Sequence, residues 1–224
     1  MTFKILTDST ADLPESWTQE HDVQVLGLTI QLDGQTHETV GPNKLTSEQL
    51  LAKMESGSKP TTSQINVGQF EDVFRQYAQE GTAVLYVAFA SALSGTYQRA
   101  VMAREMVLED YPEAIITILD TKAASMGEGL LVMKAVEARA AGQSLEQTAD
   151  LLQSLVPRVQ TYFLVDDLNH LMRGGRISKA AALMGSLVNI KPIIAVTADG
   201  SLDSVANVRG KKKAQAEVVR MTLE

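Results

Sequence analysis

Residues 83–98 join an apolar run, Ala83-Val84-Leu85-Tyr86-Val87-Ala88-Phe89, to a polar segment, Ala90-Ser91-Ala92-Leu93-Ser94-Gly95-Thr96-Tyr97-Gln98. The apolar run is short and rich in residues that favour β-structure, which predicts a strand buried within a parallel sheet. A helical pattern begins directly after the polar segment. Open α/β sheets bind ligands in such loops, where free N–H groups at the helix N-terminus attract anions. We therefore expect a ligand loop containing Ser94 and Gly95, because glycine permits close approach to the backbone.

A second polar strip, Lys59-Pro60-Thr61-Thr62-Ser63-Gln64, joins a helical run that ends near Gly57 to one that begins after Asn66. Pro60 has a fixed φ and favours an extended conformation at the residue before it. The four uncharged side chains that follow can hydrogen-bond an anion. Because Ser and Thr are also common in ordinary turns, the strip alone fits both a binding loop and a helix-linking turn.

Strands and helices alternate up to Pro157. Strands are predicted at 3–6, 83–89 and 114–119, and an extended segment at 23–32 is followed by the hairpin signal Asp33-Gly34 and a returning strand at 35–40. Helices are predicted after Asp12, after Asn66 and after the capping boxes that begin at Thr46 and Ser144. This alternation is typical of right-handed βαβ units and predicts a three-layer α/β domain with a parallel sheet.

Pro157 marks the predicted domain boundary, because the order of elements changes after it. Residues 1–157 form the predicted α/β domain, and 158–224 the start of a smaller α+β domain. The elements expected there are a strand at 162–165, a short helix at 166–172, a break at Gly174-Gly175, a helix from Ser178 to about Leu187, hairpin strands at 190–197 and 202–208, and a helix at 211–224.

The composition is that of a soluble globular protein, with 45% apolar and 21% charged residues and no apolar run long enough to span a membrane. The sequence shows no signal-peptide pattern and no cysteine, so we expect a cytoplasmic protein without thiolate metal sites. The net charge of −7 argues against a broad nucleic-acid-binding surface. Basic residues gather at 209–213, which fits either a solvated helix start or a docking patch for an acidic partner or a phosphate.

Five motifs occur in a characteristic order and spacing. They are Thr7-Asp8-Ser9-Thr10-Ala11-Asp12-Leu13-Pro14, the strip 59–64, Leu93-Ser94-Gly95-Thr96-Tyr97, Leu171-Met172-Arg173-Gly174-Gly175-Arg176-Ile177-Ser178, and Asn189-Ile190-Lys191-Pro192-Ile193, with Arg209 extending the match. Over nearly the whole chain they resemble the DegV family of bacterial fatty-acid-binding proteins. The resemblance implies a non-catalytic subunit of a fatty acid kinase, without a cofactor. It would hold a long-chain fatty acid, such as palmitate, stearate or oleate, between its two domains.

Carboxylate binding fits the residues that carry the resemblance. Thr62 and Ser94 offer neutral donors from two loops expected at one sheet edge, and Arg176 brings charge from the second domain on a Gly-Gly turn. The predicted fatty-acid site also includes Thr61, Ser63 and Gly95. Each buried methylene contributes roughly 0.8 kcal/mol, so the acyl chain supplies most of the affinity and the head group needs only orientation. The resemblance places Arg209 at the docking surface for the kinase catalytic subunit.

Other chemistries have weaker support. Ser94 lies in a strand–loop–helix context, so a serine-dependent acyl hydrolase or transferase is the alternative function, but the first glycine of G-x-S-x-G is missing. His170 is the only histidine near a candidate loop. Asp166-Asp167 with His170 lacks a second cluster of metal ligands, and no nucleotide-binding signature is present. A phosphate- or nucleic-acid-binding module at 209–213 conflicts with the acidic net charge.

The sequence stops inside its last predicted helix, whereas DegV-family proteins are longer by a few dozen residues. The resemblance implies that this further segment pairs with strands of the second domain and supplies a His near the ligand carboxylate. The sequence is either a fragment of a longer protein or a natively short form. If the 224 residues are the entire polypeptide, we expect a partly open acyl site, a more solvated Arg176 and self-association through the second domain.

Overall fold

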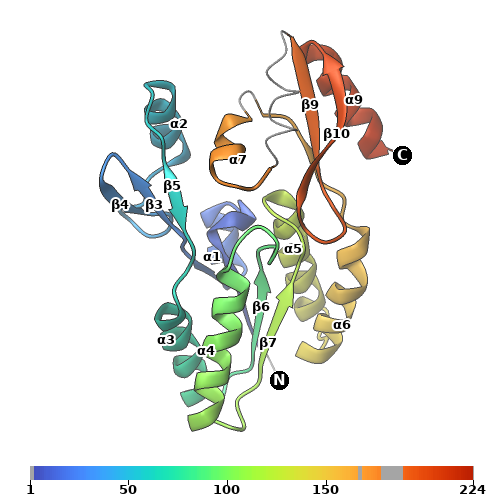
Figure 1. Cartoon of the computed structure of the whole chain (residues 1–224). Coiled ribbons are helices and arrows are strands. Elements are labelled where there is room, and N and C mark those ends of the chain that lie inside the picture. Colours follow the sequence, from blue (N-terminus) through green and yellow to red (C-terminus); the bar gives the residue numbers. More distant parts are fainter. Residues whose placement is uncertain (1–2, 166–167, 178–188, 224) are drawn as a thin grey trace. The chain divides into compact units, whose positions relative to one another are not determined.

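A computed structural model describes residues 3–165, 168–177 and 189–223. The chain divides into two compact units, Met1–Val156 and Pro157–Glu224 (Figure 1). The helix predicted from Ser178 to Leu187 and the pair Asp166-Asp167 lie outside the described residues.

The first unit is built on a four-stranded parallel sheet with the strand order β2-β1-β6-β7. Its strands are β1 (Lys4–Asp8), β2 (Val23–Leu26), β6 (Val84–Ala88) and β7 (Ile116–Asp120). Every residue of β6 is fully buried, which confirms the prediction of a central parallel strand from its unbroken apolar sequence.

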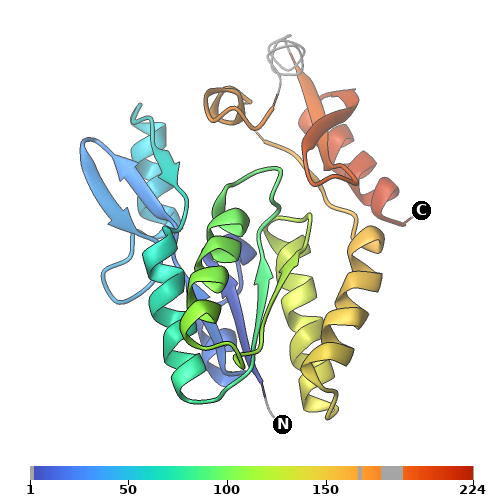
Figure 2. The same ribbon diagram turned by 60° about the horizontal axis from the view of Figure 1, so that its bottom comes forward.

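Helices cover both faces of this sheet, which confirms the predicted three-layer α/β architecture (Figure 2). α3 (Val67–Gln79) and α4 (Thr96–Asp110) pack together on one face, and α5 (Met126–Ala140) and α6 (Leu145–Leu155) on the other. The aromatic centre of the core is Phe70 of α3, whose ring centroid lies 5.1 Å from that of Tyr86 and 5.7 Å from that of Phe74. Burial of each such ring stabilises the fold by about 1.5–3 kcal/mol.

Two of the predicted helix starts are capping boxes that the structure confirms. The Thr46 hydroxyl accepts from Gln49 N–H at the start of α2 (Ser47–Glu55), and Ser144 accepts from Gln147 N–H at the start of α6. The prediction that Asp12 caps a helix was wrong. Asp12 has a left-handed backbone (φ 52°), and α1 (Glu15–Glu20) begins only after Pro14.

A small antiparallel sheet with the order β4-β3-β5 also belongs to the first unit. The segment predicted as one extended run at 23–32 divides into β2 and β3 (Thr29–Leu32), which join different sheets. The Asp33-Gly34 hairpin is confirmed, because β3 pairs with β4 (Gln35–Glu38) across this turn. β5 (Thr61–Ser63) pairs with the other edge of β3, so the strip expected to be a loop or turn contains a short strand.

The second unit contains an antiparallel sheet with the order β10-β9-β8. β9 (Ile190–Val196) and β10 (Leu202–Arg209) form the predicted hairpin, and β8 (Tyr162–Phe163) is two residues shorter than expected. α7 (Asn169–Arg173) lies within the described range 168–177, and α9 (Lys211–Leu223) packs against all three strands. Among the residues that the structure describes, no helix is both long and apolar enough to cross a membrane.

Candidate functional site

The loop between β6 and α4 is held by carboxylates from the two strands that flank β6. Asp8, at the end of β1, accepts a hydrogen bond from the Phe89 N–H at 3.1 Å. Asp120, at the end of β7, accepts from the Ser91 N–H at 3.1 Å and from the Ser91 hydroxyl at 2.6 Å. These contacts were not predicted from the sequence, although Asp8 and Asp120 at the ends of two predicted strands were a usable signal. The loop that carries Ser94 is therefore held in position from both sides.

Ser94 lies just before α4 and is half-buried. Its Oγ accepts from the Thr96 N–H at 3.2 Å and lies 2.9 Å from the hydroxyl of Thr96, which is fully buried. This arrangement fixes the rotamer of Ser94 beside the helix N-terminus, where the first backbone N–H groups carry partial positive charge. The site can therefore present a hydroxyl and a positive dipole to an anion.

Gly95 brings the two polar strips together. A Cβ atom added to Gly95 would lie only 2.0 Å from Oε1 of Gln64, so the Gln64 side chain packs directly on the glycine backbone. From the sequence, the lack of a side chain at Gly95 was expected to let a ligand approach the backbone. In the structure the same space accommodates Gln64, which follows β5.

The prediction that Thr62 and Ser94 lie at one edge of the same sheet was wrong. Thr62 pairs with Ile30 in the small antiparallel sheet, whereas Ser94 follows a strand of the parallel sheet. Long-range strand pairing, which local sequence does not reveal, places β5 beside β3. The contact between Gln64 and Gly95 joins the two strips across these separate sheets.

The hydroxyls of β5 are available to solvent. Thr61, Thr62 and Ser63 are all exposed, and within the described part of the chain none of their side chains makes a hydrogen bond. Exposed hydroxyls lose little by exchanging water for a ligand oxygen, and they donate to a carboxylate without a charge of their own.

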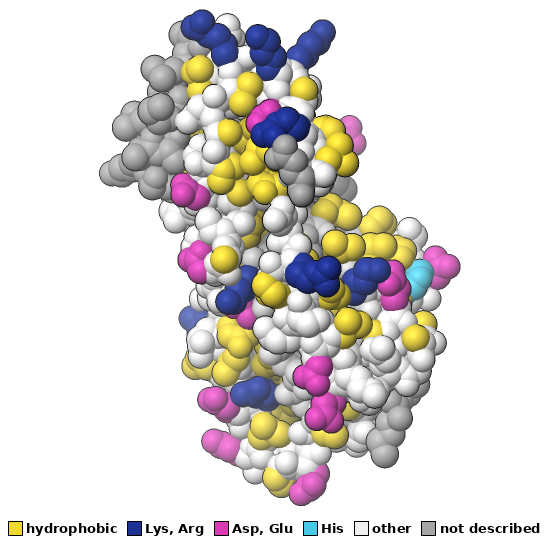
Figure 3. All heavy atoms as spheres, turned by 90° about the vertical axis from the view of Figure 1, so that its right-hand side faces the viewer, with side chains coloured by type: hydrophobic (Ala, Val, Ile, Leu, Met, Phe, Trp, Pro, Cys, Tyr) yellow, Lys and Arg dark blue, Asp and Glu magenta, His cyan; other side chains and the backbone are white. Residues whose placement is uncertain are grey.

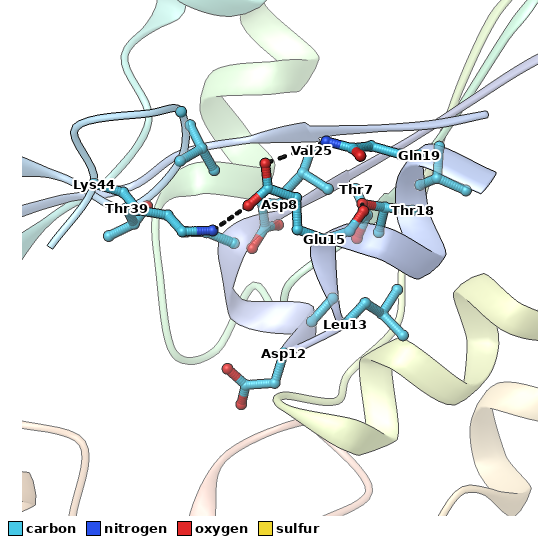
Figure 4. Close-up of a pocket in the computed structure, with 15 residues that line it drawn as sticks. Thr7, Asp8, Asp12, Leu13, Glu15, Thr18, Gln19, Val25, Thr39 and Lys44 are labelled. Carbon is cyan, nitrogen blue, oxygen red and sulfur yellow. Dashed lines mark hydrogen bonds and ion pairs between the residues drawn. The ribbon is translucent and has the colours of Figure 1, made fainter. Parts of the chain in front are cut away.

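A cavity of about 270 Å³ lies in the first unit between α1, β2 and the segment 39–44. Figure 4 shows Lys44 and Gln19 both directed toward Glu15, with Asp12 pointing away from this group. The Lys44 ammonium lies 2.5 Å from Glu15, and Gln19 donates to the other Glu15 oxygen at 3.2 Å. The lining of this cavity includes neither Thr62 nor Ser94, so it lends no support to the predicted head-group site.

In the second unit, the Gly-Gly turn ends α7. Gly175 has a left-handed backbone (φ 73°), and the N–H groups of Gly175 and Arg176 donate to the carbonyls of Met172 and Leu171 at 3.0 and 2.9 Å. This is the Schellman pattern of a helix C-terminus. It sets the direction of the exposed Arg176, whose guanidinium donates to the Gly174 carbonyl.

Arg209 is the exposed last residue of β10, directly before the lysines that begin α9. Figure 3 shows Lys and Arg side chains grouped at one end of the second unit. The four basic residues at positions 209–213 are all exposed: Arg209, Lys211, Lys212 and Lys213.

The described contacts of Ser94 include no general base that could activate it as the nucleophile of a hydrolase. Within the described ranges, the only side-chain hydrogen bond of Ser94 is to Thr96. His21 stacks on Trp17, and His170 lies 2.6 Å from the Arg173 guanidinium. The described residues also contain no cluster of three or more His, Asp or Glu able to hold a metal ion.

The parallel sheet, with helices on both faces and a polar loop at the carboxyl end of β6, defines an α/β protein. The family model described as "Uncharacterised protein, DegV family" matches residues 2–224, and the chain belongs to the DegV family. A DegV domain-containing protein of Streptococcus pyogenes serotype M1 is 56% identical over 219 residues, which cover 98% of this chain and 77% of that protein.

Two solved structures share this fold along almost the whole chain. One is a stearic acid-binding protein from Eubacterium ventriosum, with a TM-score of 0.90, 30% identity, and coverage of 98% of this chain and 75% of that chain. The other is a fatty-acid-binding DegV family protein from Thermus thermophilus, with a TM-score of 0.86, 34% identity, and coverage of 99% and 77%.

Proposed function

We propose that this chain binds a long-chain fatty acid and presents its carboxylate to a separate kinase catalytic subunit, without catalysing the phosphorylation itself. The observation that carries the proposal is the contact of two polar strips, the exposed hydroxyls of β5 and the Ser94 loop, through Gln64 and Gly95. Support comes from family membership and from the fatty acids named for the solved relatives.

The proposed head-group donors are the hydroxyls of Thr62 and Ser94, with Thr61, Ser63 and the Gly95 backbone beside them. A hydrogen bond to a charged group contributes about 1.5–3 kcal/mol, and solvent at an exposed strand favours the lower end. Burial of an acyl chain of sixteen to eighteen carbons contributes on the order of 10 kcal/mol before the costs of association. The hydroxyls therefore orient the carboxylate, and the acyl chain supplies most of the affinity.

Arg176 is the proposed cationic contributor from the second unit. Its guanidinium is exposed at the end of a Schellman turn, and a guanidinium can bind a carboxylate through two parallel hydrogen bonds. The role of Arg176 is separable from that of the hydroxyls, because Arg176→Ala removes charge and leaves both polar strips intact.

The test compares oleate binding by the wild-type protein and by Thr62→Ala/Ser94→Ala. We expect roughly a hundredfold weaker binding, from about 1.4 kcal/mol for each lost hydroxyl. The matched control is Thr36→Ala/Ser154→Ala. It also removes one threonine hydroxyl and one serine hydroxyl, but from exposed positions on β4 and α6 of the same unit. Unchanged affinity in the Thr62/Ser94 variant, with a normal unfolding temperature, would remove these residues from the head-group site.

A further inference from the structure

Two carboxylic acids are fully buried side by side in the first unit. Asp8 ends β1, and Glu128 lies in the first turn of α5. α5 closely approaches the 3₁₀ turn η1 (Ser9–Ala11), which follows β1, because Gly129 has no side chain and a Cβ there would lie 2.6 Å from the carbonyl oxygen of Ala11. The Thr10 hydroxyl lies between the two acids, 2.5 Å from Asp8 Oδ1 and 2.8 Å from Glu128 Oε2.

The number of protons in this cluster is too small if both acids are ionised. Thr10 Oγ1 has its two contacts with Asp8 and Glu128, and Thr7 Oγ1 lies 3.0 Å from the Val87 carbonyl and 3.1 Å from Glu128 Oε1. Each hydroxyl has one proton, and carbonyl and carboxylate oxygens have none. When both acids are ionised, two hydroxyl protons serve four oxygen–oxygen contacts, so two contacts lack a donor. A proton on Glu128 Oε2 can donate to Thr10 while Thr10 donates to Asp8. Thr7 then donates either to Val87 or to Glu128 Oε1, and one contact instead of two is left without a proton.

Asp8 is the better candidate for the ionised member of the pair. Its two oxygens accept from the Thr10 N–H at 3.1 Å, the Tyr86 hydroxyl at 2.8 Å and the Phe89 N–H at 3.1 Å, in addition to the Thr10 hydroxyl. Donors to a carboxylate stabilise its charged form. Among the described residues, the Glu128 carboxyl group has hydrogen-bond contacts with the two threonine hydroxyls and with no backbone N–H.

We propose that Glu128 carries a proton at neutral pH, and that this proton lets the ionised Asp8 act as a positioning residue for the Ser94 loop. The link is the Phe89 N–H, which Asp8 holds at the start of that loop. When Glu128 ionises, a second buried negative charge stands beside Asp8, and the pair separates. The Asp8–Phe89 bond is then lost. The consequence for ligand retention rests on the proposed function, whereas the proton and its effect on the loop do not.

The groups that face Glu128 favour its neutral form. Within the part of the chain that the structure describes, its titratable neighbours are Asp8 on β1, Asp12 after the short 3₁₀ turn and Tyr86 on β6, and none of these three is a cation. Burial raises the pKa of Glu128 well above its ordinary value, and the negative charges of Asp8 and Asp12 raise it further. Burial also raises the pKa of Asp8, so the two acids titrate as one coupled system.

This arrangement determines how stability depends on pH. In the unfolded chain Glu128 loses its proton near pH 4.3, whereas the folded protein keeps it to higher pH. Between these two pKa values the unfolded state binds fewer protons, so stability falls as pH rises. The stabilisation is complete below the unfolded pKa and is lost by the time pH has passed the folded pKa.

The test compares Glu128→Gln with the wild-type protein from pH 4 to 9. Gln mimics the protonated acid, because its amide donates toward Thr10 and its oxygen accepts from Thr7. Above about pH 4.3 the unfolding constant of the wild type should rise relative to that of Glu128→Gln by about tenfold per pH unit, up to the folded pKa. Glu109→Gln, at an exposed position on α4, is the control and should follow the wild type. Parallel pH profiles for wild type and Glu128→Gln would overturn the proposal.

Hydrogen exchange of the Phe89 amide, measured without ligand, tests the positioning role. Protection should decrease above the folded pKa in the wild type and stay constant in Glu128→Gln, and oleate binding should follow the same profile. Constant protection in the wild type would overturn the positioning role. Absence of oleate binding at every pH would instead contradict the proposed function. The exchange of the Phe89 amide would still decide whether Asp8 positions the Ser94 loop. If Glu128→Gln does not fold, proton release by the wild type on unfolding at pH 7 gives the answer, since an ionised Glu128 releases none.

Discussion

Removal of the Tyr86 hydroxyl should destabilise the fold through the loss of one hydrogen bond to Asp8. Tyr86 is fully buried, and its hydroxyl donates to Asp8 at 2.8 Å. Tyr86→Phe keeps the ring contact with Phe70 and removes only this hydrogen bond. A hydrogen bond to a buried charged group contributes about 1.5–3 kcal/mol, and the loss leaves the buried Asp8 carboxylate with one donor fewer.

A destabilisation of about 2 kcal/mol corresponds to a decrease in the unfolding temperature of about 4–8 °C for a chain of this size. Thermal unfolding followed by circular dichroism measures it. Tyr111→Phe is the matched control, because the Tyr111 hydroxyl accepts from Gln79 at an exposed position and its loss should change stability by less than about 0.5 kcal/mol. Equal shifts in the two variants would show that Asp8 does not depend on Tyr86, and would refute this reading of the buried network.

Three further changes test separate parts of the structure. Gly95→Ala should displace the Gln64 side chain and weaken oleate binding several-fold with little loss of stability, and adding Gln64→Ala should relieve the clash. Gly175→Ala should destabilise the second unit by about 1–2 kcal/mol because its φ is 73°, whereas Gly174→Ala, with φ −71°, should be nearly neutral in chemical denaturation. Arg209→Ala should spare oleate binding but reduce acyl-phosphate formation with the kinase subunit, and loss of oleate binding would place Arg209 in the ligand site instead.

Local patterns in the sequence predicted those elements whose causes are local. The unbroken apolar run at 83–89 gave the central strand, because only a strand covered on both faces tolerates such a composition. The capping boxes at Thr46 and Ser144 and the Asp33-Gly34 turn were also correct, since each depends on contacts within four residues. The prediction that Asp12 is an N-cap failed, because aspartate is common at N-caps but also tolerates the left-handed backbone conformation that Asp12 has here.

Long-range contacts of the candidate site could not be predicted in the same way. β5 pairs with β3 across about thirty residues of sequence, and nothing in the strip 59–64 specifies that partner. The burial of Glu128 could not be predicted either. A glutamate in the first turn of a helix is usually solvated and interacts favourably with the positive end of the helix dipole. Ser94 was correctly placed after the central strand, but its role in ligand binding stays a prediction.

Native mass spectrometry of the protein purified from cells is the most direct test of fatty-acid binding. We expect a complex whose excess mass is that of a long-chain fatty acid and which releases the free acid on denaturation. The same measurement on Thr62→Ala/Ser94→Ala should show much less bound acid, and Thr36→Ala/Ser154→Ala should match the wild type. A protein without any such ligand that also fails to take up added oleate, or an acyl group bound covalently to Ser94, would contradict the account.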